Sequence, residues 1–158
     1  MAVAYLSIGT NIGNKRKNLI TASALLAERA GDILALSAFY ETEPWGFDSK
    51  NEFLNAVLLL ETQNSPEELL ALSSLIELEM GRTVKSSGQY HDRIIDIDIL
   101  LYDDLIMETS SLTLPHPRMH QRLFVLEPMI EIAPNVIHPT LKKSILELYQ
   151  SCLSDKGD

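Results

Sequence analysis

Residues 53–80, FLNAVLLLETQNSPEELLALSSLIELEM, carry the clearest structural signal in the sequence. The part from 53 to 61 is apolar and rich in residues that favour strands, and Thr62-Gln63-Asn64 then forms a turn signal. Ser65 follows as an N-cap, with Pro at the first helical position and Glu at the third. The stretch therefore predicts a strand over 53–61, a turn, and a helix over 66–80.

The same reasoning extends outward in both directions from this stretch. Strands are predicted over 3–8, 33–42 and 93–102, and apolar residues at three- and four-residue spacing predict a helix over 15–30. The order β-α-β-β-α-β predicts an α+β, ferredoxin-like sandwich with an antiparallel sheet and both helices on one face. A proline-rich C-terminal extension with a short helix near 144–153 is expected to cover the second face.

The composition describes an ordinary globular protein. With 158 residues, 46% of them hydrophobic and 22% charged, the chain is expected to form one domain over residues 1–158. A net charge of -9 argues against nucleic acid and anionic membranes as partners. The single cysteine, Cys152, excludes an internal disulfide, and the N-terminus lacks the features of a signal peptide. We therefore expect a cytoplasmic protein.

Two acidic residues interrupt the predicted strand over 93–102. Because side chains alternate along a strand, Asp96 and Asp98 share one face, and the same alternation places Leu100 and Tyr102 on that face. Two carboxylates two residues apart can converge on a hard cation such as Mg²⁺. The same pattern also describes a half-exposed strand, or acids paired with Arg93 and another base.

Two further segments have residue types suited to binding. The run Leu114–Phe124, LPHPRMHQRLF, brings Arg and His close to a rigid pair of prolines, which suits a phosphate site but also describes a solvated connector. Aromatic side chains after the second strand, with Asn55 nearby, could hold a planar heterocycle, although such residues are often plain core. The turn 9–14 lacks the Lys and Ser/Thr of a P-loop.

Three separated motifs together resemble the 6-hydroxymethyl-7,8-dihydropterin pyrophosphokinase family of folate biosynthesis. They are Ile95–Leu100 (IDIDIL), Pro115–Met119 (PHPRM) and Thr42–Gly46 (TEPWG). Ser7–Gly13 and Phe53–Ala56 are also similar to that family, and the resemblance covers residues 3 to about 140. It implies a ferredoxin-like fold and transfer of the β,γ-pyrophosphoryl unit of ATP to a reduced pterin, with release of AMP.

The resemblance also implies roles for individual residues. Asp96 and Asp98 would hold two Mg²⁺ ions that bridge the phosphates of ATP, with Arg82 and Arg93 beside them in the catalytic group. The implied phosphate ligands are Arg82, Lys85, Arg93, His116 and Arg122, and Glu77 and Thr113 would lie nearer the nucleotide. The implied pterin residues are Thr42, Pro44, Trp45, Phe53, Asn55, Tyr90 and Phe124. The expected partners are ATP and the reduced pterin, and the protein is expected to be a monomer.

The sequence departs from the family pattern in two places. The predicted loop over 82–92 lacks the Trp and the additional Arg that this family usually carries there, so Tyr90 is the aromatic residue expected at that position. Phe53 stands where Tyr is common, which removes a hydroxyl group and keeps the ring.

Two other functions remain open on the sequence. A metal-dependent phosphohydrolase would use Asp96 and Asp98 to activate water in place of an alcohol. A ferredoxin-like ligand-sensing or interaction module would need no turnover, since this fold supports many functions.

Overall fold

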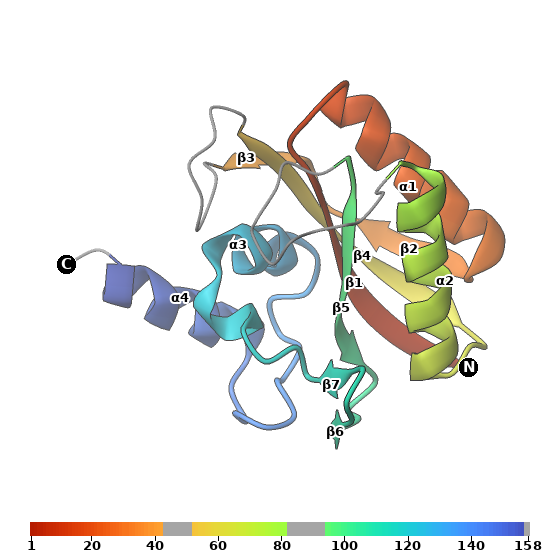
Figure 1. Ribbon diagram of the computed structural model, residues 1–158. Coiled ribbons are helices and arrows are strands. Elements are labelled where there is room, and N and C mark those ends of the chain that lie inside the picture. The colour runs from red at the N-terminus through yellow and green to blue at the C-terminus, as the bar shows by residue number, and fades with distance from the viewer. Residues whose placement is uncertain (43–51, 82–93, 157–158) are drawn as a thin grey trace.

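The computed structural model describes residues 1–42, 52–81 and 94–156 and has an antiparallel sheet at its centre (Figure 1). The strands lie in the order β2-β4-β1-β5, and β3 also pairs with β4. All of these pairings are antiparallel. The strands are β1 (Ala2–Thr10), β2 (Asp32–Leu36), β3 (Tyr40–Thr42), β4 (Phe53–Thr62) and β5 (Asp96–Tyr102). This topology confirms the predicted ferredoxin-like fold.

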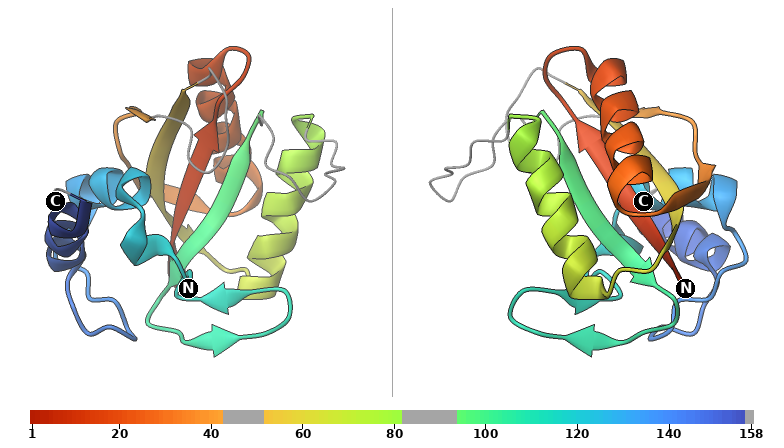
Figure 2. Two further views of the ribbon diagram at one scale, coloured as in Figure 1. Left: turned by 60° about the vertical axis from the view of Figure 1, so that its left-hand side comes forward. Right: turned by 90° about the vertical axis from the view of Figure 1, so that its right-hand side faces the viewer.

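Two helices cover one face of the sheet, as predicted (Figure 2). They are α1 (Lys15–Arg29) and α2 (Pro66–Glu79). The predicted capping box of α2 is present: Ser65 Oγ accepts from Glu68 N at 3.1 Å, and Glu68 Oε1 accepts from Ser65 N at 2.8 Å. Aliphatic side chains of the two helices and of β1, β4 and β5 form a buried core between the layers.

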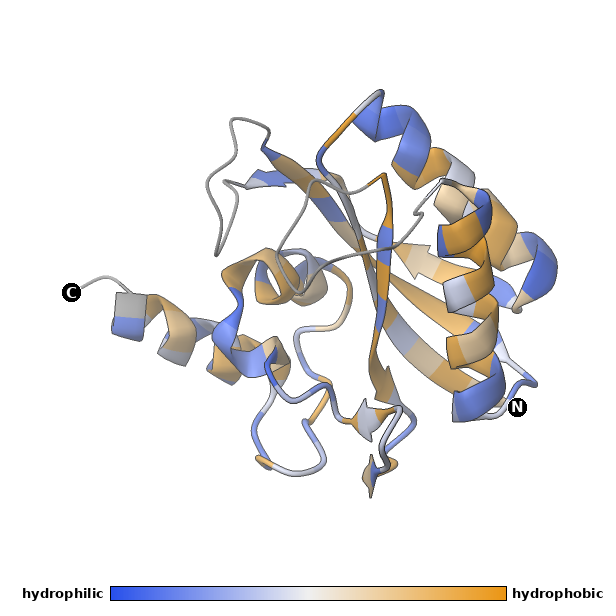
Figure 3. Cartoon of the chain, in the orientation of Figure 1, coloured by the Kyte–Doolittle hydropathy of each residue, from blue (hydrophilic) through white to orange (hydrophobic). Residues whose placement is uncertain are grey.

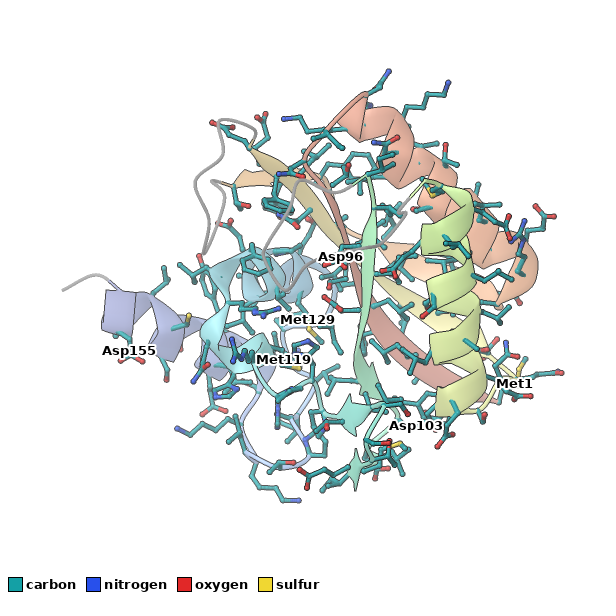
Figure 4. All side chains as sticks on the ribbon, viewed as in Figure 1. Met1, Asp96, Asp103, Met119, Met129 and Asp155 are labelled. Atoms are coloured by element: carbon teal, nitrogen blue, oxygen red, sulfur yellow. The ribbon has the colours of Figure 1, made fainter. Side chains whose placement is uncertain are left out.

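The C-terminal part of the chain covers the opposite face (Figure 2). It contains a short β6–β7 hairpin (Met107–Glu108 and Thr113–Leu114), the 3₁₀ turn η1 (Met119–Gln121), α3 (Leu123–Ile132) and α4 (Ile145–Lys156). A second core joins η1, α3 and α4 to the sheet through Val57 and Leu101, with Met119 and Met129 fully buried between them (Figure 4), whereas Leu114 of the hairpin packs in the first core. The prediction that the extension covers the second face is confirmed.

Helix α3 was not predicted, because Pro128 lies inside it. Proline removes one N–H from the helical ladder and is usually read as a helix breaker. Here Val125, Leu126 and Met129 are buried against the sheet. Their burial stabilises the helix despite the missing hydrogen bond.

The single strand predicted over 33–42 is wrong, since the edge chain forms β2 and β3 with a break between them. Ser37 still pairs with Val57, whose N–H donates to Ser37 Oγ at 3.0 Å, and Tyr40 pairs with Asn55. Residues 38–39 therefore stand opposite one residue of β4, which is the arrangement of a β-bulge.

The predicted face of Tyr102 is also wrong. The register between β1 and β5 shifts at Tyr5/Leu6, so that Leu6 pairs with Ile99 and Tyr5 with Leu101. This bulge reverses the alternation after Leu100. The Tyr102 ring packs against the helix-side core, where its hydroxyl donates to Asn64 O at 2.7 Å. The strand also begins at Asp96, three residues later than predicted.

Polar residues interrupt the apolar strands of the sheet near one end (Figure 3). On β5 the interruptions fall at Asp96 and Asp98, both half-buried. Across 1–42, 52–81 and 94–156, no helix is long and apolar enough to cross a membrane.

Candidate active site

Polar groups from several strands lie side by side on the face of the sheet that α3 covers. Gly9 of β1 pairs with Asn55 on one side and with Asp96 on the other, and Asn55 in turn pairs with Tyr40. Neighbouring strands are about 4.8 Å apart, so Asn55 and Asp96 stand roughly 10 Å apart across Gly9. The sheet thus places an amide and a carboxylate at the two ends of one short row.

Gly9 has no side chain at the centre of this row. A Cβ atom built on it would lie 2.5 Å from Asn55 Oδ1. Asn55 is 7% exposed, and its Nδ2 donates to Thr42 Oγ1 at 2.9 Å. The floor between Asn55 and Asp96 is therefore flat, and any larger residue at position 9 would displace the Asn55 amide.

Asp96 and Asp98 form the acidic end of the site. Asp98 pairs with Ser7, next to the Gly9 row, so the two carboxylates share a face as the sequence predicted. Both are half-buried, and hard carboxylate oxygens of this kind suit Mg²⁺. Within the described ranges, no cluster of three His, Cys, Asp or Glu side chains could hold a metal. The donor set therefore fits a cation that shares its remaining coordination positions with a ligand or water.

A cavity of about 280 Å³ lies along the outer edge of β5. It is bounded by α2, by the edge of β5 and by the turn of the β6–β7 hairpin. Its lining residues are Leu70, Ile97, Asp98, Ile99, Thr109, Ser110, Ser111, Leu112, Thr113, His116 and Pro117. Because Asp98 and His116 line it, the cavity adjoins the acidic end of the site.

The edge of β5 offers backbone groups to this cavity. Glu77 of α2 is 8% exposed, and its Oε2 accepts from Ile97 N at 2.7 Å. Backbone groups of alternate residues face the same edge of a strand, so those of Ile99 point in the same direction as those of Ile97. Glu77 thus fixes the outer edge of the strand, and Ile99 presents an N–H and a C=O beside the cavity.

His116 is held as a neutral ring. The backbone N–H of His116 donates to Leu100 O at 2.9 Å, and the ring Nδ1 accepts from Arg118 N at 3.1 Å. Burial lowers the pKa of His116 to about 4, helped by the charges of Arg122 and Arg118 and opposed by Asp96. With Nδ1 used as an acceptor, the ring proton lies on Nε2, which is left to donate to an oxyanion.

This pKa predicts a pH dependence of stability. Between about pH 6.5 and pH 4, His116 is protonated in the unfolded chain but remains neutral in the folded protein. The free energy of unfolding therefore falls as the pH falls through this window, from about pH 6.5 to about pH 4. We expect the melting temperature of the metal-free protein to fall more in the wild type than in His116→Gln over that range. His138, whose pKa is also lowered by burial, contributes to both proteins. Identical pH profiles would contradict the assignment.

Arg122 and Phe124 lie at the start of α3. Arg122 ends η1 and takes the N-cap position of α3, and its Cζ lies 5.5 Å from the centre of the Phe124 ring. The ring belongs to the group of partly buried residues on the second core. A guanidinium and an aromatic face therefore stand on the helix that packs over β4 and β3.

The comparisons with known proteins agree with this geometry. Residues 5–134 match the model of the 7,8-dihydro-6-hydroxymethylpterin-pyrophosphokinase (HPPK) family. The chain belongs to the HPPK family. It is similar to the 2-amino-4-hydroxy-6-hydroxymethyldihydropteridine pyrophosphokinases of Porphyromonas gingivalis strain W83, at 49% identity, and of Bacillus subtilis strain 168, at 42%. These alignments cover 88% and 85% of this chain and 95% and 80% of the relatives.

Solved structures of HPPK proteins share the fold. A wild-type Plasmodium falciparum HPPK-DHPS crystal structure has a TM-score of 0.77 at 20% identity, and a triple-mutant form has 0.80 at 19%. Both alignments cover 99% of this chain but only 42% and 45% of those chains. The present chain therefore spans less than half the length of the HPPK-DHPS proteins.

Most of the predicted HPPK site residues in the described part of the chain fall around these features. Thr42, Asn55, Asp96 and Asp98 lie on the second face, and Phe53 pairs with Thr42 at the start of β4. Thr113 and His116 line the cavity, and Glu77 lies on its edge. The predicted Pro44, Trp45, Arg82, Lys85, Tyr90 and Arg93, with the loop 82–92, lie outside the described residues.

Sequence reasoning missed three contributors to this candidate site. Gly9 was read as the end of a strand, whereas β1 continues through it to Thr10. Leu70 and the hairpin turn 109–112 line the cavity but carry no motif. A glycine at the end of an apolar strand is a signal of close approach, and it could have drawn attention to position 9.

Proposed function

We propose that this chain transfers the pyrophosphoryl group of ATP to 6-hydroxymethyl-7,8-dihydropterin, giving AMP and the pterin pyrophosphate. This is the folate-biosynthesis reaction of the HPPK family, and ATP and the pterin are its two substrates. The row that places Asn55 and Asp96 on either side of Gly9 is the observation that carries the proposal. It offers one surface on which a flat heterocycle and a polyphosphate can meet.

The adenine base of ATP would lie in the cavity beside β5. The backbone N–H and C=O of Ile99 would pair with the neighbouring acceptor and donor groups on one edge of the adenine ring. Leu70 would contact the face of the base. Thr113 lies in the same wall, and Glu77 acts by holding the strand edge. From this cavity the phosphates would pass His116 toward Asp98.

The pterin would lie flat over Gly9. The coupled Thr42 and Asn55 side chains offer hydrogen-bonding groups to its polar edge, and Phe124 offers an aromatic face. Phe53, Pro44, Trp45 and Tyr90 are proposed to complete this pocket. Gly9 has no side chain to block the space between Asn55 and Asp96. If Asn55 binds the pterin ring, the hydroxymethyl group would therefore extend toward Asp96.

We propose that Asp96 and Asp98 hold two Mg²⁺ ions together with phosphate oxygens and water. When bound, Mg²⁺ supplies positive charge that offsets the charge on the transferring phosphoryl group. Asp96 and Asp98 fix where that charge sits, because both project from the same strand. The neutral Nε2–H of His116 donates to a phosphate oxygen, and Arg122 adds a fixed positive charge.

The reaction then follows from positioning. The hydroxymethyl oxygen attacks the β-phosphorus and releases its proton to solvent. The bond from that phosphorus to the oxygen bridging the α-phosphate breaks, and AMP leaves with that oxygen. Arg82, Lys85 and Arg93 are proposed as further phosphate ligands. In this class of reaction the protein contributes mainly alignment and electrostatic stabilisation.

The remaining expectations concern the whole protein. We propose that residues 1–158 form a single domain that acts as a monomer. The lone Cys152 is consistent with a reducing compartment, and we propose the cytoplasm.

The proposal is tested by assaying the purified protein with ATP, the hydroxymethyl-dihydropterin and Mg²⁺. We expect AMP and the pterin pyrophosphate in equal amounts, no AMP when the pterin is omitted, and no turnover when EDTA removes the metal. AMP or ADP formed without the pterin would instead indicate a phosphohydrolase. Nucleotide binding without any turnover would indicate a ligand-sensing module.

A further inference from the structure

Glu131, near the C-terminal end of α3, makes contacts that the reaction described above does not use. Its Oε1 accepts from the Tyr40 hydroxyl at 2.7 Å. Its two carboxylate oxygens also lie 3.0 and 3.1 Å from Ala38 N, which donates to them. Ala38 belongs to the break between β2 and β3, where the edge chain leaves the sheet ladder. Glu131 therefore accepts the Ala38 N–H at the break between β2 and β3, and it also links α3 to β3.

The two ends of this connection carry the proposed pterin residues. Tyr40 and Thr42 are two residues apart on β3 and lie on the same face. Phe124 and Glu131 are seven residues apart in α3, close to two helical turns, and so lie on the same side of the helix. Thr42 also accepts the hydrogen bond from Asn55. Hence α3 carries the aromatic face, β3 carries the polar edge, and Glu131 joins them.

Among the described residues, few other features fix the position of β3. It is a three-residue strand whose one strand neighbour in the described part of the chain is β4, so its outer side lies at the edge of the described sheet. Short edge segments of this kind open locally at low free energy. The contact with α3 is thus well placed to hold Thr42 at a fixed distance from Phe124.

We propose that Glu131 is a positioning residue for the pterin: by joining Tyr40 and Ala38 to α3, it sets the width of the pocket between Thr42 and Phe124. The inference rests on the proposed function, because it takes the pterin to bind there. The strength of the contact is supported by Tyr40, whose pKa is raised to about 12, chiefly by its hydrogen bond to Glu131. Because Glu131 is exposed, its loss is expected to weaken pterin binding and not to abolish it.

The test compares Glu131→Gln and Tyr40→Phe with Glu127→Gln as a matched control. The control removes the same charge one turn earlier in α3, where no hydrogen bond to β3 is involved within the described residues. For each protein we would measure the KM values of pterin and ATP, kcat, and the equilibrium Kd of the pterin with Mg²⁺ and a nonhydrolysable ATP analogue. Melting temperatures would confirm that each variant is folded.

We expect Glu131→Gln to raise the KM and Kd of the pterin roughly fivefold, and Tyr40→Phe roughly threefold, the size of one exposed charge-assisted hydrogen bond. The KM of ATP should stay within twofold, and Glu127→Gln should match the wild type. In the double variant the two effects should not add, because both residues form one contact.

Two outcomes separate the inference from the proposed function. A wild type that makes no pterin pyrophosphate would overturn the function. An active wild type, with Glu131→Gln and Tyr40→Phe both leaving pterin affinity unchanged, would overturn the positioning role alone. Equal losses of pterin and ATP affinity would also overturn it, because they would indicate a general loss of structure.

Discussion

Asp96→Asn and Asp98→Asn are each expected to reduce kcat by a factor of about 1,000 or more. The change removes one negative charge and leaves the size and shape of the side chain intact, so the fold should survive. The substitution removes the charge that would hold Mg²⁺ against the phosphates. A metal contact of this kind stabilises the transition state by several kcal/mol. A loss of about 4 kcal/mol corresponds to a thousandfold fall in rate. Steady-state assays of AMP release would measure the effect.

Asp103→Asn provides the matched control. Asp103 follows the other end of β5, far from Asp96 (Figure 4). Its Oδ1 accepts from Val3 N at 2.9 Å, an acceptor that Asn keeps, and Asn tolerates its φ of 48°. We therefore expect nearly unchanged kcat in this variant. Wild-type rates in Asp96→Asn and Asp98→Asn would rule out both residues as the metal site.

Gly31→Ala is expected to lower the free energy of unfolding by about 3 kcal/mol or more, which is roughly 10 °C in melting temperature for a chain of this size. Gly31 follows α1, and a Cβ atom there would overlap the carbonyl oxygen of Glu61 on β4. The chain cannot move away easily, because Thr62 Oγ1 and Asn64 Nδ2 donate to Ala30 O at 2.6 and 3.0 Å. Both clashing partners are thus fixed backbone.

Gly13→Ala is the control for this variant. Gly13 has a φ of 73°, but the nearest atom to a Cβ there is Asn18 Nδ2 at 3.7 Å, ordinary contact distance. Only the cost of a left-handed conformation remains, about 1 kcal/mol. Thermal or urea unfolding would separate the two. Equal losses would mean that backbone conformation, and not the close approach to β4, decides the effect at Gly31.

Local signals predicted the part of the fold that depends on local interactions. Ser65 and the residues after it define the start of α2, because capping involves only neighbouring residues. Helix α3 and the bulge at Leu100 depend on packing against other segments, and a single sequence does not display such contacts. Helix α4 was predicted near its true position, and its own capping box between Ser144 and Glu147 was overlooked.

The candidate site likewise contains residues that local spacing predicts and residues that only strand pairing brings together. The two-residue spacing of Asp96 and Asp98 was enough to place them on one face, since only one strand is involved. Which residues stand beside them depends on how β1, β4 and β5 pair. Residue types alone drew attention to Asn55 and His116, and the resemblance to the HPPK family supplied their expected roles, whereas Gly9 needed the observed register to be recognised. Glu131 could not be predicted, because its partner lies at a break in a strand that the sequence presents as continuous.

The cross-strand row at Gly9 also bears on how the protein reaches activity. Its members come from positions 9, 40, 55 and 96, and the strands that carry them meet only after long loops of chain have closed. Pairing of segments this distant in sequence slows folding. The proposed site is therefore complete only when the whole sheet has formed, and a chain with an unpaired strand would lack one wall of it.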